Sequence, residues 1–218
     1  MNILFSDEHI VVAEKKAGIL SQSDEKGREN MISLLESALS CKVYPIHRLD
    51  RETAGVMVFA KTSFAASAIS QDIQKGNFKK EYFAVLSKKP QEKEGVFEDL
   101  LFYDRAKNKV FPVKRERKGV KKARLSYRLE DEKSDLHLVR VFPETGRTHQ
   151  IRVQFASRKM PLYGDKKYGG SGEGLALYCH KLSLIHPKTK KEITFSALPS
   201  DGKIWNTFFP TKKEENEK

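Results

Sequence analysis

The sequence lacks any apolar run near the roughly 18 residues that a membrane-spanning helix needs, and its longest clean stretch is about 55–60. Asp7 and Glu8 precede every apolar block, so no secretory signal is expected. Cysteine is scarce too. Cys41 and Cys179 form no CxxC pair, which argues against a disulfide framework and suits buried thiols in a reducing compartment. These absences predict a cytoplasmic protein without a membrane segment.

Several site signatures are also missing. The sequence contains no GxxxxGK[ST] phosphate loop, no GxGxxG fingerprint and no GxSxG nucleophile elbow. Its six histidines show neither HExxH nor a Cys/His zinc spacing. The glycine-rich run 169–174 contains no lysine and follows Tyr168 rather than a strand, so we interpret it as a flexible loop. We therefore expect no metal and no cofactor.

Positive charge is in excess, with 41 Lys and Arg against 29 Asp and Glu and a net charge of +12 over 218 residues. Ten basic residues and one acid, Glu116, fall in Arg105–Arg124, which we call the basic arm. With Gly119 at a hairpin tip, such an arm suits an RNA phosphate backbone contacted without sequence readout. The residues expected to make these contacts are Lys114, Arg115, Lys121 and Lys122. The alternative is a solvated sheet edge that its lysines protect from aggregation.

Hydrophobic spacing predicts more strands than helices. Helices are expected at 31–39, from a cap at Ser63 to Gly76, from Thr148 to Ser157, and at 204–209. Strands are expected at 3–5, 10–13, 55–61, 78–87, 110–113, 123–130, 136–142, 182–185 and 192–197. The pattern predicts an α+β fold, with a mixed, mainly antiparallel central sheet flanked by helices and loops. We expect a single catalytic domain over 1–210, followed by a charged tail over 211–218.

Two polar segments are candidates for chemistry. In 47–55, Arg48 and Asp50 project to the same side of an extended chain, and neighbouring cations keep the carboxylate ionised. An ionised carboxylate serves as a nucleophile or an electrostatic stabiliser, and the alternative is an ordinary Arg–Asp pair before a strand. In 145–152, five donor-bearing side chains precede or begin a helix, where phosphate binds well. The alternative there is a helix with a polar first turn and Thr148 as its N-cap.

These segments together resemble the RluA family of RNA pseudouridine synthases, and the similarity runs over nearly the whole chain. Segment 47–55 is similar to the family's HRLDxxTSG signature, 80–82 to its tyrosine strand, 145–152 to TGRTHQIR, 164–169 to GDxxYG, and 177–187 to LHAxxLxxxHP. The departures are Lys16 for proline, Ala54 for serine, and Tyr178-Cys179 for His-Ala. Many relatives begin with an S4 RNA-binding module, whereas here the similarity to the catalytic domain begins at residue 3, so we expect a stand-alone catalytic domain.

The resemblance implies an α+β enzyme that isomerises uridine in structured RNA to pseudouridine, with no metal or cofactor. It implies that Asp50 is the catalytic carboxylate, which either attacks C1′ or assists glycosidic cleavage. Arg152 would pair with Asp50, and Tyr82 would stack on the target base. Arg48 would replace the flipped base in the helical stack, which recovers part of the stacking energy lost on flipping. The other residues implied in base flipping or substrate binding are Leu177, His47, Arg147, His149 and Gln150.

The expected partner is an rRNA or tRNA stem-loop, and the expected oligomeric state is a monomer. One alternative is a non-catalytic RNA-binding or ribosome-assembly factor on the same fold, although a binder has no need of Asp50, Tyr82 and Arg152. A second alternative is a nucleosidase that uses Asp50, although the basic arm favours a polymeric substrate.

Overall fold

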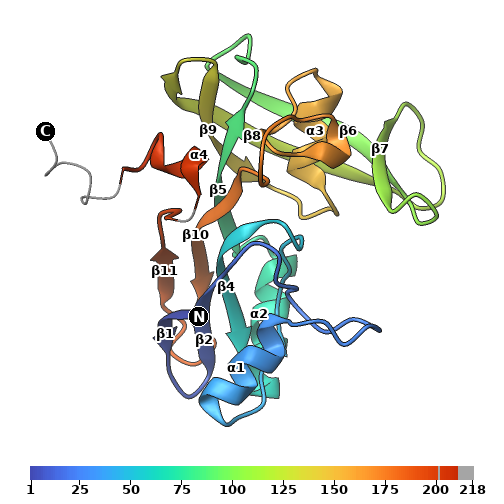
Figure 1. Cartoon of the computed structure of the whole chain (residues 1–218). Helices are drawn as coiled ribbons and strands as arrows, with labels where there is room; N and C mark the ends of the chain where they lie inside the picture. The colour runs from blue at the N-terminus through green and yellow to red at the C-terminus, as the bar shows by residue number, and fades with distance from the viewer. Residues whose placement is uncertain (201, 211–218) are drawn as a thin grey trace, which may run out of the picture. The chain divides into compact units, whose positions relative to one another are not determined.

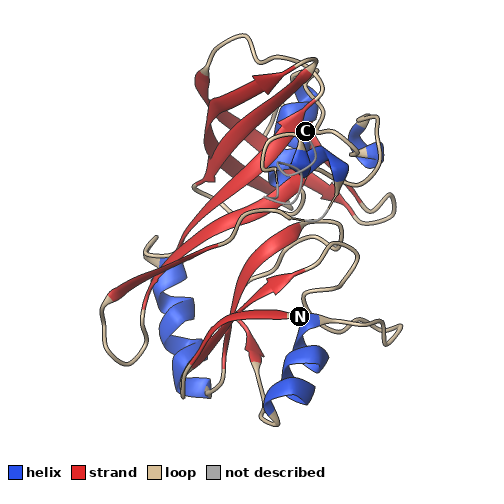
Figure 2. Ribbon diagram, turned by 60° about the vertical axis from the view of Figure 1, so that its left-hand side comes forward, coloured by secondary structure: helices blue, strands red, loops and turns tan. Residues whose placement is uncertain are grey.

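The computed structural model describes residues 1–200 and 202–210, so the predicted tail 211–218 lies outside the described residues. The chain forms two compact units, each described separately here. Unit 1 comprises Met1–Lys80 and Cys179–Ala197, and unit 2 comprises Glu81–Tyr178 and the chain from Leu198 onward. Both units are built mainly from strands (Figure 2), as the α+β prediction requires.

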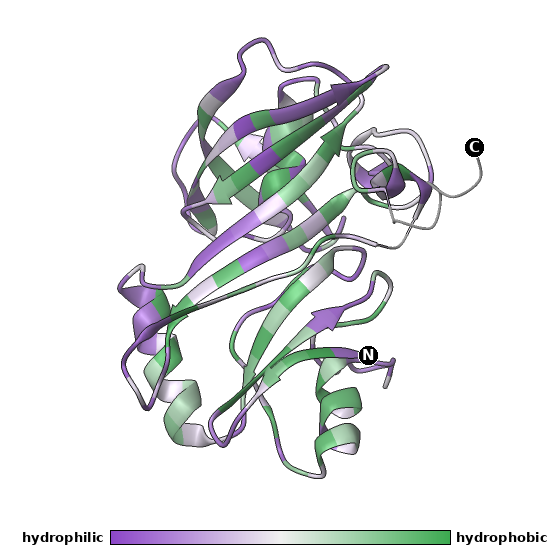
Figure 3. Ribbon diagram, turned by 90° about the vertical axis from the view of Figure 1, so that its left-hand side faces the viewer, coloured by the Kyte–Doolittle hydropathy of each residue, from purple (hydrophilic) through white to green (hydrophobic). Residues whose placement is uncertain are grey.

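Unit 1 is a sheet with two helices. Its elements are β1 (Asn2–Ser6), β2 (Ile10–Lys15), α1 (Met31–Leu39), β3 (Tyr44–Pro45), β4 (Ala54–Ala60), α2 (Ser63–Gln74), β11 (Glu192–Ser196) and most of β10 (Leu177–Ile185). The strand order is β1-β2-β4-β10, with β11 on β10 and β3 on β4. Strands β2 and β4 are almost wholly buried, and their apolar residues are green in Figure 3.

The two helices of unit 1 begin at side-chain caps. Asn30 accepts the amide of Ser33 at the start of α1, and Thr62 accepts the amide of Ala65 at the start of α2. The predicted cap at Ser63 is therefore displaced by one residue, because the threonine before it already satisfies the free amide. Helix α1 matches its predicted range.

Two parts of unit 1 that are distant in sequence are joined by a partly buried polar contact. His186 Nε2 lies 2.7 Å from Asp7 Oδ2, and His186 Nδ1 accepts the amide of Thr189 at 3.1 Å. Asp7 Oδ1 accepts the amides of His9 and Ile10 at 2.7 and 2.8 Å. The pKa of Asp7 is lowered, because these hydrogen bonds and His186 outweigh the burial that would raise it. The contact ties the start of β2 to the turn after β10.

Unit 2 is an antiparallel sheet in the order β5-β9-β8-β6-β7 (Figure 1). Its elements are most of β5 (Lys79–Leu86), with β6 (Glu94–Asp104), β7 (Lys109–Val113), β8 (Val120–Lys133), β9 (Leu136–Pro143), α3 (Gln150–Ser157), the 3-10 helix η1 (Lys166–Tyr168) and α4 (Lys203–Asn206). Leu101, Val110 and Ala123 form a buried cluster with Val153 of α3, and Tyr168 packs against it. Helix α3 therefore covers one face of β6, β7 and β8, which we call the inner face.

The basic arm does not form the predicted hairpin. Strands β7 and β8 both pair with β6, one on each side of it, so residues 114–119 cross from one neighbour of β6 to the other. The crossing segment lies against Phe102, whose ring is 4.6 Å from the Arg117 guanidinium carbon. Gly119 has φ +88 and so permits the turn into β8. No strand was predicted at β6, so the predicted strands at β7 and β8 were expected to be neighbours joined by a hairpin.

Candidate active site and RNA-binding surface

The loop that carries Asp50 is fixed to the body of unit 1 at both neighbouring residues. On one side, the Ser21 hydroxyl donates to the Leu49 carbonyl at 2.8 Å and accepts the Leu49 amide at 3.0 Å. On the other, the Arg51 carbonyl accepts the Gly18 amide and the Lys15 ammonium, both at 2.9 Å. The half-buried Asp50 is therefore presented from a backbone with little freedom.

We call the hydrogen bonds that Ser21, Gly18 and Lys15 make to this loop the clamp. Lys15 is its most unusual member, because it carries an ammonium group and yet has 0% exposure. Besides Arg51, it donates to the carbonyls of Ile19 at 2.7 Å and Lys16 at 3.1 Å. Burial lowers its pKa to about 8, against the opposing charges of Glu52 and Asp50 that raise it. Neither Lys15 nor Ser21 was among the residues predicted from the sequence.

We expect Lys15 to give unit 1 a distinct pH dependence. Its pKa is lower in the folded state than in the unfolded chain, so the ionised group costs stability below about pH 8, and that cost disappears as pH rises towards 10.5. We compare the free energy of unfolding of the wild type with that of Lys15→Met. The difference, wild type minus variant, is expected to rise by about 3 kcal/mol between pH 8 and pH 10.5. Urea unfolding at several pH values measures it. The exposed neighbour Lys16, changed to Met, is the control, and an equal pH dependence in both variants would contradict the assignment.

His47 and Arg48 occupy different environments on the same loop. The His47 ring packs on Phe78 with ring centroids 5.1 Å apart, and its Nε2 accepts the Val58 amide at 3.1 Å. Burial, and secondarily the Lys80 charge, lower the His47 pKa to about 3, so the ring is neutral at physiological pH. This places His47 in the support of the loop, whereas Arg48 is exposed.

In unit 2, Arg152 is held by a carboxylate that the sequence analysis did not single out. The Arg152 Nε and Nη2 atoms lie 2.8 Å from the two Asp165 oxygens, with side-chain exposures of 7% and 0%. Such a two-point contact fixes the plane of the guanidinium group. The predicted pairing of Arg152 with Asp50 would link the two units, and it stays a prediction.

Tyr168 connects this part of unit 2 with the basic arm. Its hydroxyl oxygen accepts the Val110 amide at 2.9 Å and lies 2.8 Å from His149 Nδ1. The Arg152 guanidinium carbon is 5.3 Å from the centre of the Tyr168 ring. A single aromatic side chain thus contacts β7, the residue before α3, and Arg152.

Helix α3 begins two residues after the predicted cap. His149 occupies the N-cap position in the left-handed conformation, with φ 50, and makes no side-chain cap hydrogen bond there. The Thr148 prediction is therefore wrong, because the chain turns at His149 before the helix begins. The left-handed conformation of a non-glycine residue is costly, and the predicted role of this segment in the site stays a prediction.

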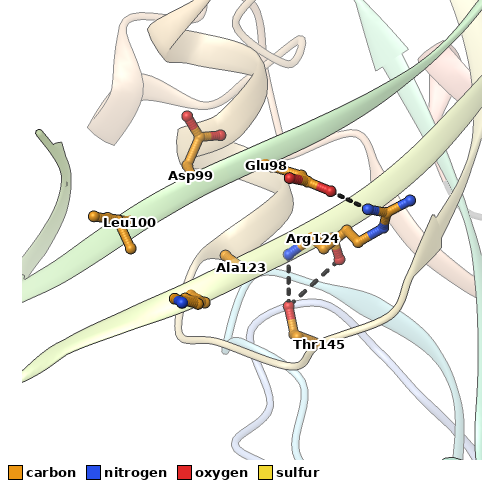
Figure 4. A pocket seen from close by; sticks show the side chains of 7 residues that line it. Glu98, Asp99, Leu100, Ala123, Arg124 and Thr145 are labelled. Atoms are coloured by element: carbon orange, nitrogen blue, oxygen red, sulfur yellow. Dashed lines mark hydrogen bonds and ion pairs between the residues drawn. The ribbon is translucent and has the colours of Figure 1, made fainter. Parts of the chain in front are cut away.

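The buried Gln150 holds the segment that precedes α3. Its side-chain oxygen accepts the Thr145 hydroxyl at 2.8 Å and the Arg147 amide at 3.0 Å, and its amide nitrogen donates to the Arg124 carbonyl at 3.0 Å. Figure 4 shows the Thr145 hydroxyl against the backbone of Arg124, whose side chain pairs with Glu98. Gln150 therefore positions this segment, while Arg147 is exposed on it.

The other candidate residues lie on strands or in the arm. Tyr82 and Leu177 are buried, on β5 and β10. Lys121 and Lys122 point to opposite faces of β8, since Lys121 lies opposite the buried Leu101 and Lys122 opposite Leu100. Lys114 and Arg115 belong to the crossing segment, so the four predicted phosphate contacts are spread over both faces.

Beside Thr145, a cavity of about 420 Å³ is lined mainly by residues of β6 and β8. Figure 4 shows the side chains of its lining residues. Its lining combines two acids, Glu98 and Asp99, with two cations, Lys122 and Arg124, so its charge favours neither an anion nor a cation. In the described part of the chain, no group of three or more His, Cys, Asp or Glu residues is placed to hold a metal ion. None of the helices described is both long and apolar enough to cross a membrane. Cys41 is half-buried and Cys179 buried, and neither forms a disulfide bond.

Comparison with known proteins gives consistent results. The family model described as RNA pseudouridylate synthase matches residues 9–157. An uncharacterised RNA pseudouridine synthase of Bacillus subtilis, YhcT, is 34% identical over 96% of this chain and 72% of its own length. The tRNA pseudouridine synthase C of Haemophilus influenzae is 30% identical over 90% of this chain and 92% of its own. A solved structure of human RNA pseudouridylate synthase domain containing 4 has a TM-score of 0.75 at 21% identity, over 94% of this chain and 90% of that one, so it shares the fold.

Proposed function

The chain belongs to the RNA pseudouridylate synthase family, RluA type, and from this membership we propose that it modifies a uridine in a tRNA or rRNA stem-loop with Asp50 as the catalytic carboxylate. It is an isomerase that converts uridine in RNA to pseudouridine, and the non-catalytic alternative is disfavoured. The match in length to a tRNA pseudouridine synthase supports tRNA as the first substrate to test.

The reaction needs no atom from outside the substrate. The bond between N1 of uracil and C1′ breaks, the base turns, and a bond forms between C5 and C1′. A proton leaves C5 and another binds N1, so the product is an isomer. A single carboxylate that acts at C1′ meets this requirement, because no water attacks the sugar, unlike in glycoside hydrolysis.

The observation that carries the proposed role of Asp50 is the clamp on its loop. Hydrogen bonds to Leu49 and Arg51 restrain the backbone on either side of the carboxylate, which is the preorganisation that catalysis requires. We assign Asp50 to C1′, as nucleophile or as the group that assists cleavage. Tyr82 is assigned to stacking on the target base, Leu177 to lining its pocket, and Arg152 to pairing with Asp50.

The remaining residues fall into two proposed groups. Arg48 and Arg147 are exposed cations, which suits replacement of the flipped base by Arg48 and a phosphate contact by Arg147. His47, His149 and Gln150 are assigned to positioning, since each has a ring nitrogen or amide engaged within the protein.

The decisive experiment is a pseudouridine map of total RNA from cells with and without this gene. We expect at least one tRNA or rRNA position to lose pseudouridine when the gene is deleted, and to regain it when the purified protein is added to that RNA. A wild-type protein that leaves uridine unchanged in every cellular RNA would overturn the proposed function.

The basic arm is expected to contribute the salt-dependent part of RNA affinity. Changing Lys114, Arg115, Lys121 and Lys122 together to glutamine should weaken binding several-fold. It should also flatten the slope of log affinity against log salt, since each lost phosphate contact removes about 0.9 from that slope for a duplex. Lys122 should contribute least, because it is paired with Glu116 at 3.1 Å.

A charge-matched control comes from unit 1. Exchanging the exposed Lys42, Lys75, Lys188 and Lys190 for glutamine removes the same charge from the protein. If the arm variant kept the wild-type slope, or if both variants lost the same amount, the arm would have no specific role in RNA binding.

A further inference from the structure

A second cavity, of about 200 Å³, opens on the inner face of the unit 2 sheet. Its floor contains Leu101 and Val110, which are buried members of the cluster beneath α3. Tyr103 and Lys121 continue the same face, because Tyr103 lies opposite Val110 and Lys121 opposite Leu101. The cavity thus lies where the inner face of the sheet is open to solvent.

The other wall of this cavity belongs to the segment before α3. Arg147 and Thr148 line it, and both are exposed. The described lining therefore combines an apolar floor, two cations, a hydroxyl group and an aromatic ring, and none of its residues is acidic. This composition differs from that of the 420 Å³ cavity, whose lining includes Glu98 and Asp99.

Two side chains of the cavity are held in place by the protein. The Tyr103 hydroxyl donates to Asn108 Oδ1 at 2.8 Å, and Asn108 has the left-handed conformation, with φ 46, at the turn between β6 and β7. The ring nevertheless stays 39% exposed. Arg147 Nε donates to the Lys122 carbonyl at 2.9 Å, which anchors its guanidinium group on β8. An exposed ring and an anchored cation at one cavity form a preorganised surface for a flat anionic ligand.

We propose that this cavity binds one nucleotide of the substrate RNA other than the target uridine, with its base against Tyr103 and its phosphate between Lys121 and Arg147. The volume is below the roughly 300–1,000 Å³ of typical small-molecule sites, so a single nucleotide unit fits better than a larger ligand. Base stacking on an aromatic ring beside cations is how proteins bind unpaired nucleotides without reading sequence. The proposal rests on the proposed function, because it assigns a subsite to the same RNA substrate.

The first test distinguishes the contribution of the Tyr103 ring to RNA binding from that of its hydroxyl group. Tyr103→Ala is expected to weaken binding of a short oligouridylate about tenfold, whereas Tyr103→Phe, which keeps the ring, stays within about twofold of the wild type. On the RNA found by the pseudouridine map, Tyr103→Ala should raise KM and leave kcat unchanged, because the subsite does not contact the reacting base. A merely structural role would lower the melting temperature and affect both kinetic constants.

The second test locates the nucleotide directly. An oligouridylate that contains 4-thiouridine, irradiated with the wild-type protein, is expected to crosslink to a peptide that contains Tyr103 or Lys121, and Lys121→Gln should reduce the yield. Crosslinks confined to other peptides would overturn the proposal, as would wild-type affinity in Tyr103→Ala. If the wild type crosslinks at Tyr103 but converts no uridine, the proposed function fails and the subsite stands. If it converts uridine but shows no crosslink there, the subsite alone fails.

Discussion

Asp50→Asn is expected to bind RNA as the wild type does and to form pseudouridine at least about 10³-fold more slowly, a loss of about 4 kcal/mol of transition-state stabilisation. The amide keeps the size of the side chain but has neither the charge nor the nucleophilicity of a carboxylate. The backbone clamp of Ser21 and Lys15 involves only the neighbouring residues, so it survives the substitution. Single-turnover conversion of the mapped RNA measures the effect.

The matched control is Glu52→Gln, two residues further along the same loop. Glu52 is 51% exposed and paired with the equally exposed Arg51 at 3.1 Å, so we expect less than a twofold change in rate. If Asp50→Asn kept a rate within tenfold of the wild type, another group would have to act at C1′, and the assignment of Asp50 would be wrong.

Asp165→Asn is expected to have the largest effect on stability. It removes the charge of a carboxylate that contacts the buried Arg152 guanidinium at two points, and removing one member of a buried pair typically costs about 3–5 kcal/mol. We expect a corresponding fall in the free energy of unfolding by urea, and a lower rate of pseudouridine formation, because Arg152 loses its fixed orientation.

The Asp24–Arg28 pair provides the comparison for this variant. It is also a close ion pair, but its side chains are 26% and 47% exposed. Asp24→Asn should therefore lower the free energy of unfolding much less than Asp165→Asn does, because solvent screens a surface pair. Equal losses for Asp24→Asn and Asp165→Asn would show that burial does not decide the energy of the Arg152 contact.

The elements with a clear local hydrophobic pattern, either a helical spacing or an unbroken apolar run, were predicted from the sequence. Helix α1 has the predicted range, and β4 lies within one residue of its predicted start and end. Strand β6 was not predicted, because Glu98 and Asp99 divide its apolar residues, so it has neither a clean alternation nor an unbroken apolar run like that of β4. Without β6, no local signal shows that β7 and β8 flank a third strand.

The residues of the candidate site also differ in whether a local pattern in the sequence reveals them. Asp50, Arg48 and Arg147 stand in charged segments that a reader of the sequence notices. Lys15 and Asp165 do not stand out in the sequence, because their partners, Arg51 and Arg152, lie 36 and 13 residues away along the chain. One signal in the sequence pointed to Lys15, because this lysine ends the apolar strand 10–15. A cation buried there needs several hydrogen-bond acceptors around it.

Strand β10 and His186, which contacts Asp7, are synthesised long after the N-terminal strands of the unit 1 sheet that they join. Unit 1 needs β10 to complete its sheet, and 98 residues of unit 2 are translated between Lys80 and Cys179. At about 5–20 residues per second, the nascent N-terminal strands wait roughly 5–20 s for their last partner. During this interval the edge of β4 that β10 later covers is open, so the growing polypeptide is most vulnerable to aggregation and chaperone capture just before β10 emerges.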